Sequence, residues 1–421
     1  MYAIKGTTIL NGHKNMTPIT GKALIVDGEK IVDIVEESEI PASAIVLDYT
    51  GKYLMPGLID LHVHIPANGY PSKKKLDYKS IAKLLKFSLA RFVVKRLCRK
   101  NAYAELLSGT TTIRAVGGVL DFDTELRNEI NAGQVAGPRI LAADWAVSVP
   151  DGHMTGSVAL PAHSAEEAVE MVRELDTHKP DLIKLMITGG VLDAKVPGEP
   201  GDLKMPPEYV KAACDEAHKL GYVVAAHVES TEGMMVALEN GVDTIEHGGR
   251  PTPEAIELLK KTGAKVIATI SPVFPFVELD TSDTGFTETD TLNGTALYKA
   301  MVELYNKCLD NGIPLGLGTD TGCPYITHYD TWRELTYFVR DCNVPAKFAL
   351  YTATLGNAKI ANIDDITGSI DIGKSADMIV LDSNPLKDLK TLKNPKAVFF
   401  RGQKFDPSKL KKNQKLEEIF D

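Results

Sequence analysis

The central part of the chain alternates short apolar runs with amphipathic helical stretches, and this alternation constrains the fold more than any other feature. Helical patterns occupy residues 164–178, 206–221 and 253–263, between the apolar runs. Regular strand–helix units over about 300 residues are typical of a (β/α)₈ TIM-type barrel, whereas an open doubly wound sheet rarely repeats so evenly. Eight strands are predicted, at residues 57–65, 111–116, 139–144, 181–188, 222–228, 243–248, 265–271 and 314–320.

Both ends of the chain show short β-rich runs separated by turn signals. In residues 1–55, the pair Asp27-Gly28 stands between two apolar runs and predicts a β-hairpin. Residues 368–382 and 396–405 have the same character. We therefore expect an α/β protein, in which residues 1–55 plus 361–421 build a small composite β-sandwich domain and residues 56–360 form the barrel inserted into it.

Composition excludes several classes of protein. The formal net charge of −9 argues against nucleic-acid binding, which needs clustered positive charge. No stretch approaches the roughly 18 apolar residues of a membrane span, and the first residues hold no signal-peptide pattern. The five cysteines form no C-x-x-C pair, which indicates reduced thiols rather than a disulfide framework or a structural zinc site. We therefore expect a cytoplasmic protein.

A strongly basic insertion, residues 66–100, follows the first predicted strand. Between Lys73 and Lys100 there are eleven Lys or Arg residues and one acid, Asp77. Residues 80–97 have helical apolar spacing with basic residues between. The insertion could form a lid, a partner surface or a contact with anionic lipid. The simplest alternative is a helix packed on the barrel or on a neighbouring subunit, with a solvated basic face.

Ligand-type side chains stand at the carboxyl ends of the predicted strands, where barrel enzymes carry their chemistry. His62 and His64 end the first strand, and their spacing of two puts both imidazoles on one face. Imidazoles are common zinc ligands. Lys184 lies inside an apolar run, where an ammonium group must be paired, neutral or chemically modified. The fifth, sixth and eighth strands end in His227, His247 and Asp320.

Each of these residues also has an ordinary explanation when it is considered alone. A histidine at a strand end can simply be hydrogen-bonded, a lysine in an apolar run can reach the surface, and an aspartate after a strand can cap a helix. Coincidence explains poorly why five strands supply such residues at one rim of the barrel. The sequence therefore predicts a metal site at this rim.

At these residues the sequence resembles the amidohydrolase superfamily. The matching pieces are PGLIDLHVH (56–64), Lys184, His227, His247 and GTD (318–320). The segment GSIDIGKSADMIVLD resembles the flanking β-sandwich of that family. The chain is most similar to the branch that holds imidazolonepropionase and the metal-dependent prolidases (Xaa-Pro dipeptidases). The pieces that indicate this branch are TTIRAVGG, residues 126–141, the turn Asp151-Gly152-His153 and GVDTIEHGG (241–249).

The resemblance implies two divalent metal ions, with Zn²⁺ expected. His62, His64 and Asp320 would bind the first ion. His227 and His247 would bind the second. Lys184, carbamylated by CO₂, would bridge the two. The chemistry is consistent, because burial lowers the pKa of a lysine, a neutral amine can form a carbamate, and a carbamate offers two anionic oxygens.

The activity that the resemblance implies is hydrolysis of a C–N amide bond in a small molecule, either a dipeptide, as in prolidases, or an N-acyl amino acid. Asp320 would accept the proton of the attacking water and pass it to the leaving nitrogen. His153 corresponds to a family position that helps to polarise the carbonyl. A homo-oligomer is also expected. The alternatives are a cyclic-amide hydrolase like imidazolonepropionase, a heterocycle deaminase, against which Lys184 argues, and a non-catalytic scaffold, against which the complete ligand set argues.

Substrate contacts are less well defined by the sequence. The prolidases tend to carry a tyrosine two residues after the histidine that matches His227, but here Glu229 stands at that position. At this spacing Glu229 could face the site, although it could also be a helix N-terminal carboxylate. Arg250 could hold a substrate carboxylate or form a surface ion pair. The remaining candidate contacts are Arg114, Tyr325 and His328.

Overall fold

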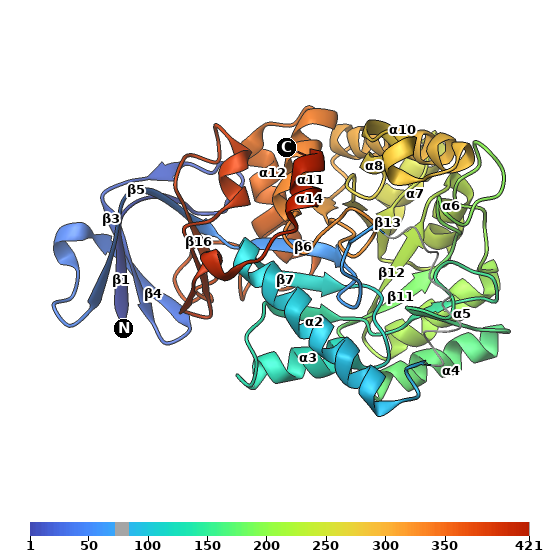
Figure 1. The fold of residues 1–421 in the computed structure, drawn as a ribbon, viewed down its shortest axis with the longest axis horizontal. Coiled ribbons are helices and arrows are strands. Elements are labelled where there is room, and N and C mark those ends of the chain that lie inside the picture. The colour runs from blue at the N-terminus through green and yellow to red at the C-terminus, as the bar shows by residue number, and fades with distance from the viewer. Residues whose placement is uncertain (72–83, 421) are drawn as a thin grey trace.

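The molecule has two parts, a β-sheet built from both chain ends and a barrel of parallel strands surrounded by helices (Figure 1). The structure is a computed structural model that describes residues 1–71 and 84–420. The expected class, an α/β barrel with a small β-sandwich domain, is confirmed. The domain boundaries after residues 55 and 360 stay a prediction.

Strands from both termini pair in the sheet order β18-β17-β16-β5-β1-β3-β4, with β2 beside β1. β5 joins the two chain ends, because it pairs in parallel with β1 and antiparallel with β16. The predicted hairpin is confirmed: Asp27 pairs with Lys30, and Gly28 turns the chain with a φ of 56°. The strands are β1 (Tyr2–Leu10), β2 (Pro18–Ile19), β3 (Lys22–Asp27), β4 (Lys30–Glu36), β5 (Ile45–Pro56), β16 (Met378–Leu381), β17 (Ala397–Phe400) and β18 (Gln403–Phe405).

All eight predicted barrel strands are present, and each pairs in parallel with a neighbour. Two further short strands, β9 (Ala146–Ser148) and β10 (Ala159–Pro161), were not predicted; they follow the third barrel strand and pair beside the fourth. The barrel strands are β6 (Leu58–Val63), β7 (Thr110–Ala115), β8 (Arg139–Ala142), β11 (Leu182–Met186), β12 (Val223–Val228), β13 (Thr244–His247), β14 (Lys265–Ala268) and β15 (Leu315–Leu317).

Backbone hydrogen bonds close the barrel between its first and last strands. The Asp320 N–H donates to the His62 carbonyl oxygen at 2.8 Å, and the His64 N–H donates to the Thr321 carbonyl oxygen at 2.8 Å. Closure therefore brings residues that are far apart in the sequence to the same point of the rim. The two ends of the predicted metal-binding set meet there.

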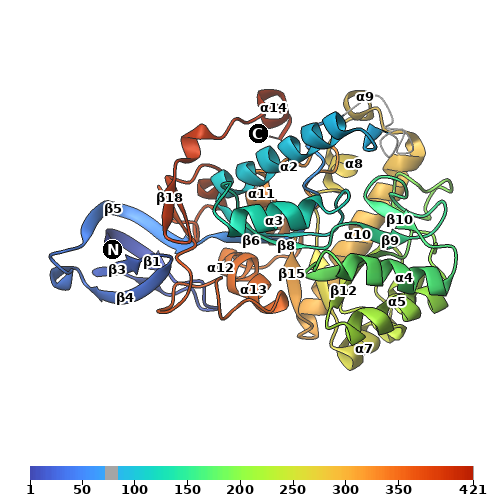
Figure 2. The same ribbon diagram turned by 90° about the horizontal axis from the view of Figure 1, so that it is seen from below.

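Helices surround the barrel strands, as Figures 1 and 2 both show. The α-helices are α2 (Ser88–Ser108), α3 (Phe122–Asn131), α4 (Ala165–Asp176), α5 (Pro207–Lys219), α6 (Thr231–Glu239), α7 (Pro253–Thr262), α8 (Phe274–Glu278), α9 (Thr281–Thr284), α10 (Glu288–Asp310), α11 (Thr331–Asp341), α12 (Ala346–Tyr351), α13 (Asn357–Ile360) and α14 (Gln414–Phe420). A π-helical turn, η2 (Thr352–Gly356), joins α12 to α13, and short 3₁₀ turns are η1 (Glu37–Glu39), η3 (Leu389–Lys393) and η4 (Pro407–Lys409).

Helix α7 shows why the sequence pattern located the helices. Thr252 caps its start by accepting the Ala255 N–H at 3.2 Å, and Pro253 occupies its first turn, where no N–H is needed. Gly263 ends the helix with a φ of 72°. Between these signals α7 buries Ile256 and other apolar residues of one face. The predicted helices therefore agree with α4, α5 and α7 to within two residues at each end.

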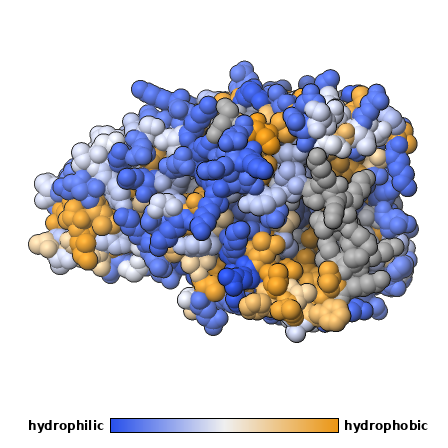
Figure 3. Space-filling view, viewed as in Figure 1, coloured by the Kyte–Doolittle hydropathy of each residue, from blue (hydrophilic) through white to orange (hydrophobic). Residues whose placement is uncertain are grey.

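Part of the basic insertion, residues 72–83, lies outside the described residues. The described part includes α2, which buries Cys98, Ala102 and Leu106 against the barrel, in agreement with a helix packed on it. The beginning of α2 and the residues just before it instead expose large apolar side chains, and hydrophobic residues gather at the lower edge of Figure 3 where α2 begins. These exposed residues are Leu84, Phe87, Leu89, Phe92 and Val93.

No helix in the described ranges, 1–71 and 84–420, is long and apolar enough to cross a membrane.

Candidate metal centre

Four imidazoles and a carboxylate converge at the carboxyl ends of the barrel strands. The ring centroid of His62 lies 5.3 Å from that of His64 and 4.7 Å from that of His247, and the rings of His227 and His247 are 4.9 Å apart. Asp320 Oδ1 lies 3.2 Å from His64 Nε2 and 3.5 Å from His62 Nε2. Side chains from four different strands therefore meet in one cluster.

Within the described residues, two groups of side chains could each hold a metal ion. The first group is His62, His247 and Asp320, and the second is His227, Glu229 and His247. In each group the potential ligand atoms all lie within 4.8 Å of one another. His247 was predicted to bind the second ion alone, whereas the geometry makes it a member of both groups.

Hydrogen bonds to the outer nitrogens orient the rings. His62 Nδ1 lies 2.8 Å from Glu246 Oε2, His64 Nδ1 donates to the Gly117 carbonyl oxygen at 2.9 Å, and His247 Nδ1 lies 2.7 Å from Thr269 Oγ1. Each of these contacts leaves Nε2 directed toward the cluster. Metal-bound histidines characteristically hold their second nitrogen in this way, so the arrangement fits a metal centre.

Lys184 is fully buried in β11, and its Nζ has no hydrogen-bond partner among the described residues. Burial lowers the pKa of this amine to about 8, although the nearby Glu246 carboxylate opposes the shift. Asp320 Oδ1 is a second buried atom without a hydrogen-bond donor of suitable geometry. Unpartnered buried polar atoms are costly. Metal ions and a carbamate on Lys184 would satisfy both atoms, so the residues present fit the divalent metal ions that the family resemblance implies.

The protonation states also suit metal binding. Burial lowers the pKa of His62 to about 4, and burial holds the pKa of His247 well below its usual value. Neutral imidazoles are the form that binds metals. Burial alone would raise the pKa of Asp320, but His62 and His64 outweigh it and hold that pKa well below its usual range. The carboxylate is therefore ionised.

Two of the candidate ligands adopt a backbone conformation that non-glycine residues rarely use. His247 has a φ of 68° and Asp320 a φ of 57°, both in the left-handed region. Such conformations cost free energy and persist where the surrounding structure enforces them, often at functional sites. The strain at these two strand ends turns both side chains into the cluster.

Arg114, a predicted substrate contact, lies beneath the cluster rather than at its mouth. Its Nη2 donates to Glu246 Oε1 at 2.7 Å, and its Nε donates to the Leu61 carbonyl oxygen at 2.7 Å. Burial would raise the pKa of Glu246, but Arg114 and His62 hold it well below its usual range. Arg114 therefore holds the carboxylate that orients His62.

Sequence reasoning missed Glu246 and Asp60, although both gave a signal. Each is a charged residue inside an apolar strand, and each is fully buried. Asp60 Oδ1 accepts the His62 N–H and the Thr319 N–H, both at 3.0 Å. It thus ties the first strand to the segment that follows the last strand. A buried carboxylate requires partners, so these two positions could have been predicted to organise the site.

His153 joins the site, as predicted. Its ring stacks on that of His227, with a centroid distance of 4.1 Å and an interplanar angle of 8°. His153 Nδ1 lies 2.5 Å from Asp193 Oδ2, and the same oxygen accepts the Gly190 N–H at 3.0 Å. Sequence reasoning missed Asp193, because the segment that follows β11 has no periodic pattern that would mark one acid among its polar residues.

Glu229 also faces the site. One oxygen, Oε2, accepts the Val191 N–H at 2.8 Å, and the other, Oε1, lies 4.0 Å from His227 Nε2. Burial raises the pKa of this carboxyl to about 8, with a further contribution from Asp320. Ser230, not Glu229, caps α6, since its Oγ accepts the Gly233 N–H. The interpretation of Glu229 as a helix N-terminal carboxylate is therefore not supported.

The other predicted substrate contacts are placed differently. Arg250 is exposed beyond β13, and its carbonyl oxygen accepts a hydrogen bond from Thr231 Oγ1 at 2.7 Å. Tyr325 is buried among aromatic rings, 6.2 Å from Phe286 by ring centroids. His328 is buried, and its Nδ1 lies 2.9 Å from Glu105 Oε1 on α2. Among the three, Arg250 alone is exposed.

Comparison with known proteins identifies the family. The model of the amidohydrolase family matches residues 53–404. The ochratoxinase of Aspergillus niger is 28% identical over 413 residues, covering 90% of this chain and 81% of that protein. A solved structure of a Bifidobacterium longum protein proposed to be a prolidase is 33% identical, with a TM-score of 0.87 over 99% of this chain and 97% of that chain. The structure of a Xaa-Pro dipeptidase with bound methionine is 29% identical, with a TM-score of 0.84 over 96% and 99%.

These comparisons confirm the resemblance drawn from the motifs, including the similarity to prolidases. They also establish the enzyme class, a hydrolase that acts on carbon–nitrogen bonds. Since the family model spans most of the sequence and the cluster of imidazoles lies within that span, the chain belongs to the amidohydrolase family.

Proposed function

We propose that this chain is a two-metal amidohydrolase that cleaves the amide bond of a dipeptide or an N-acyl amino acid. The observation that carries the proposal is that Lys184 Nζ is buried without a hydrogen-bond partner, close to imidazoles whose Nε2 atoms are directed toward one cluster. Likeness to structures described as prolidases favours these substrates. In this proposal His62, His64 and Asp320 hold one ion, His227 and His247 hold the other, and carbamylated Lys184 bridges them.

When bound, divalent ions at this site would polarise the amide carbonyl and lower the pKa of a water molecule. The protein supplies the proton transfers. Asp320 is ionised and has an unpartnered Oδ1, so it can accept the proton of the attacking water. Asp320 then delivers that proton to the leaving nitrogen, which completes cleavage of the C–N bond.

His153 is proposed to bind the carbonyl oxygen of the substrate. Asp193 fixes Nδ1, so Nε2 remains to donate a hydrogen bond. Stacking on His227 keeps the ring beside the metal-binding cluster. A donor fixed in advance stabilises the charge that develops on the carbonyl oxygen in the transition state.

We further propose zinc as the metal, because imidazole and carboxylate side chains are common zinc ligands. A cytoplasmic location agrees with the five free cysteines. Self-association into a homo-oligomer would cover the apolar side chains exposed around the beginning of α2, which include Phe87 and Phe92.

The test is product detection by mass spectrometry with zinc-loaded protein. The panel holds Xaa-Pro and other dipeptides, N-acyl amino acids, cyclic amides and aminated heterocycles, with Asp320→Asn as the blank. Cleavage of dipeptides or N-acyl amino acids that is absent in the variant is the expected result. Ring opening alone would reassign the enzyme to cyclic amides, and ammonia release alone would reassign it to the deaminases.

A further inference from the structure

The strongest unexplained feature of the barrel rim that carries the histidine cluster is the Glu229 carboxylate, one oxygen of which has no hydrogen-bond donor among the described residues. Glu229 is fixed by the Val191 N–H through Oε2, and no donor among the described residues hydrogen-bonds to Oε1. Its side chain is only 11% exposed. A nearly buried carboxylate needs a cationic or hydrogen-bonding partner, so the open oxygen indicates a position for a charged part of the substrate.

The segment that follows β11 is shaped to hold this carboxylate. Gly201 has a φ of 75°, and a Cβ at that position would lie 2.5 Å from the Glu229 carbonyl carbon. Only glycine allows so close an approach. The same segment supplies the Val191 N–H. Two contacts from one loop therefore fix both the backbone and the side chain of Glu229.

Apart from the metal ion proposed at His227 and His247, the charged side chains that act on Glu229 are acids. Asp193 and Asp320 are the neighbouring acids that act on its carboxyl group. Lys204, a lysine of the same loop, is paired with Asp202. No ion pair joins Glu229 to a lysine or arginine among the described residues. The mouth thus offers a negative position that suits an ammonium group.

The distances suit the α-ammonium of a dipeptide. Glu229 Oε1 lies 4.0 Å from His227 Nε2, and a ligand atom of His247 lies within 4.8 Å of the carboxylate. In a peptide the α-nitrogen is only about 2.5 Å from the carbonyl carbon of the same residue, as standard bond lengths require. A carbonyl placed at the histidine cluster therefore brings its own α-ammonium close to Glu229.

We propose that Glu229 binds the free α-ammonium of the substrate and makes the enzyme selective for unblocked dipeptides over N-acyl amino acids. This inference rests on the proposed function and decides between the two substrate classes that it leaves open. An N-acyl substrate would place a methyl or methylene group against Glu229, burying the carboxylate without a partner. The tyrosine that prolidases tend to carry at this position has no negative charge to offer.

The test compares two substrates that differ only in the α-amino group: Ala-Xaa and N-propionyl-Xaa, where Xaa is the best leaving residue from the dipeptide panel. Loss of one partner of a buried charge pair weakens binding by about 30-fold or more. We therefore expect kcat/KM for Ala-Xaa to exceed that for N-propionyl-Xaa by at least this factor. In Glu229→Gln the ratio should fall to within about threefold, through loss of the Ala-Xaa activity alone.

The matched control is Glu232→Gln, which removes an exposed carboxylate three residues away and should leave the ratio unchanged. Zinc content is measured for every variant, and Glu229→Tyr provides a second replacement if Glu229→Gln is poorly folded. Equal cleavage of both substrates by the unmodified enzyme would overturn the inference and leave the proposed function intact. Loss of a metal ion in Glu229→Gln would also overturn it, because Glu229 would then be a metal ligand. Cleavage of neither substrate would contradict the proposed function itself.

Discussion

Asp193 and His153 form a short carboxylate–imidazole pair, with 2.5 Å between Oδ2 and Nδ1. His153 lies in the segment that follows the third barrel strand and Asp193 in the segment that follows the fourth, so the pair joins these two consecutive loops. Gly190 closes the arrangement, since a Cβ there would lie 2.7 Å from His153 Cε1. The imidazole is therefore held in one orientation, with Nδ1 occupied and Nε2 available.

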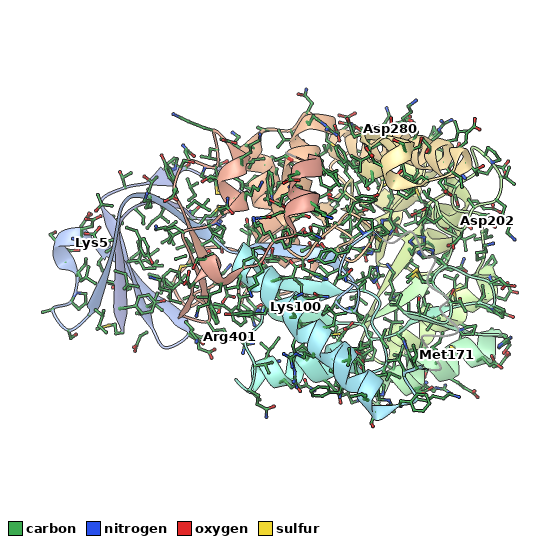
Figure 4. The ribbon with its side chains drawn as sticks, in the orientation of Figure 1. Lys5, Lys100, Met171, Asp202, Asp280 and Arg401 are labelled. Carbon is green, nitrogen blue, oxygen red and sulfur yellow. The ribbon has the colours of Figure 1, made fainter. Side chains whose placement is uncertain are left out.

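Replacing Asp193 should impair catalysis more than substrate binding. In Asp193→Ala the His153 ring loses its fixed orientation, and we expect kcat to fall on the order of 100-fold with a smaller change in KM. Steady-state kinetics with the best dipeptide measures both constants. Asp202→Asn is the control, because this acid of the same loop lies at the outer edge of the molecule (Figure 4). An unchanged kcat in Asp193→Ala would remove His153 from the mechanism.

Lys184 should react with CO₂ in a pH-dependent manner. The neutral amine is the nucleophile, and the pKa is lowered to about 8 by burial. About 1% of the amine is neutral at pH 6 and about 90% at pH 9, whereas an ordinary lysine remains mostly protonated at both values. Metal-free protein should therefore show a ¹³C-carbamate NMR signal that grows from pH 6 to pH 9 at equal dissolved CO₂.

The lysine variants separate this signal from background. Lys184→Ala should remove it, while Lys204→Ala, which lacks a half-buried lysine outside the cluster, should retain it. With zinc present, Lys184→Ala should lose at least about 1,000-fold in kcat, because groups that act as a unit fail together. A carbamate signal that survives in Lys184→Ala would show that another amine reacts and that Lys184 has a different role.

Arg114 should matter for stability, because it pairs with a carboxylate that is fully buried. In Arg114→Leu the Glu246 carboxylate loses its cation and remains in the barrel interior. Breaking a buried pair in this way costs about 3–5 kcal/mol in the free energy of unfolding. Urea unfolding of the metal-free protein at pH 7 measures the loss.

A second change distinguishes this structural role from substrate binding. Adding Glu246→Gln to Arg114→Leu removes the buried charge and should restore part of the lost stability. Arg250→Ala, at an exposed position, should stay within about 0.5 kcal/mol of the unmodified protein. If Arg114→Leu raises KM while the free energy of unfolding stays constant, Arg114 contacts the substrate after all.

The barrel could be predicted from the sequence because its strands are buried apolar runs separated by amphipathic helices. That pattern located β6 and β15 as the first and last strands of the barrel. Because the strands are parallel, their carboxyl ends, with His62 and Asp320, were expected at the same rim. β9 and β10 were missed because each is only three residues long. A run of that length carries too little alternation to mark a strand.

That the candidate ligands lie together could be predicted from the sequence, but the contacts that hold them could not. A candidate ligand can be recognised because it is a histidine or an acid at the end of a strand. The residue that hydrogen-bonds to it depends on which parts of the chain the fold brings together. Arg114 and Glu246 are 132 residues apart, and no local pattern joins them. Arg114 was consequently interpreted as a substrate contact, although its guanidinium is used inside the barrel.

Arg250 remains the candidate contact for the carboxylate at the other end of a dipeptide. Arg250 comes shortly after β13 and is exposed. Its carbonyl oxygen accepts a hydrogen bond from Oγ1 of Thr231, which stands two residues after Glu229 in the sequence. A hydrogen-bonded charge contributes about 1.5–3 kcal/mol, so Arg250→Ala should lower kcat/KM for a free dipeptide by about tenfold or more. The same dipeptide with an amidated C-terminus lacks the carboxylate and should be cleaved equally by both proteins. Arg250→Lys keeps the positive charge without the planar guanidinium, so its kcat/KM for the free dipeptide should lie between those of the unmodified protein and Arg250→Ala. An equal loss on both substrates would show that Arg250 does not read the carboxylate and that its side chain is an ordinary surface charge.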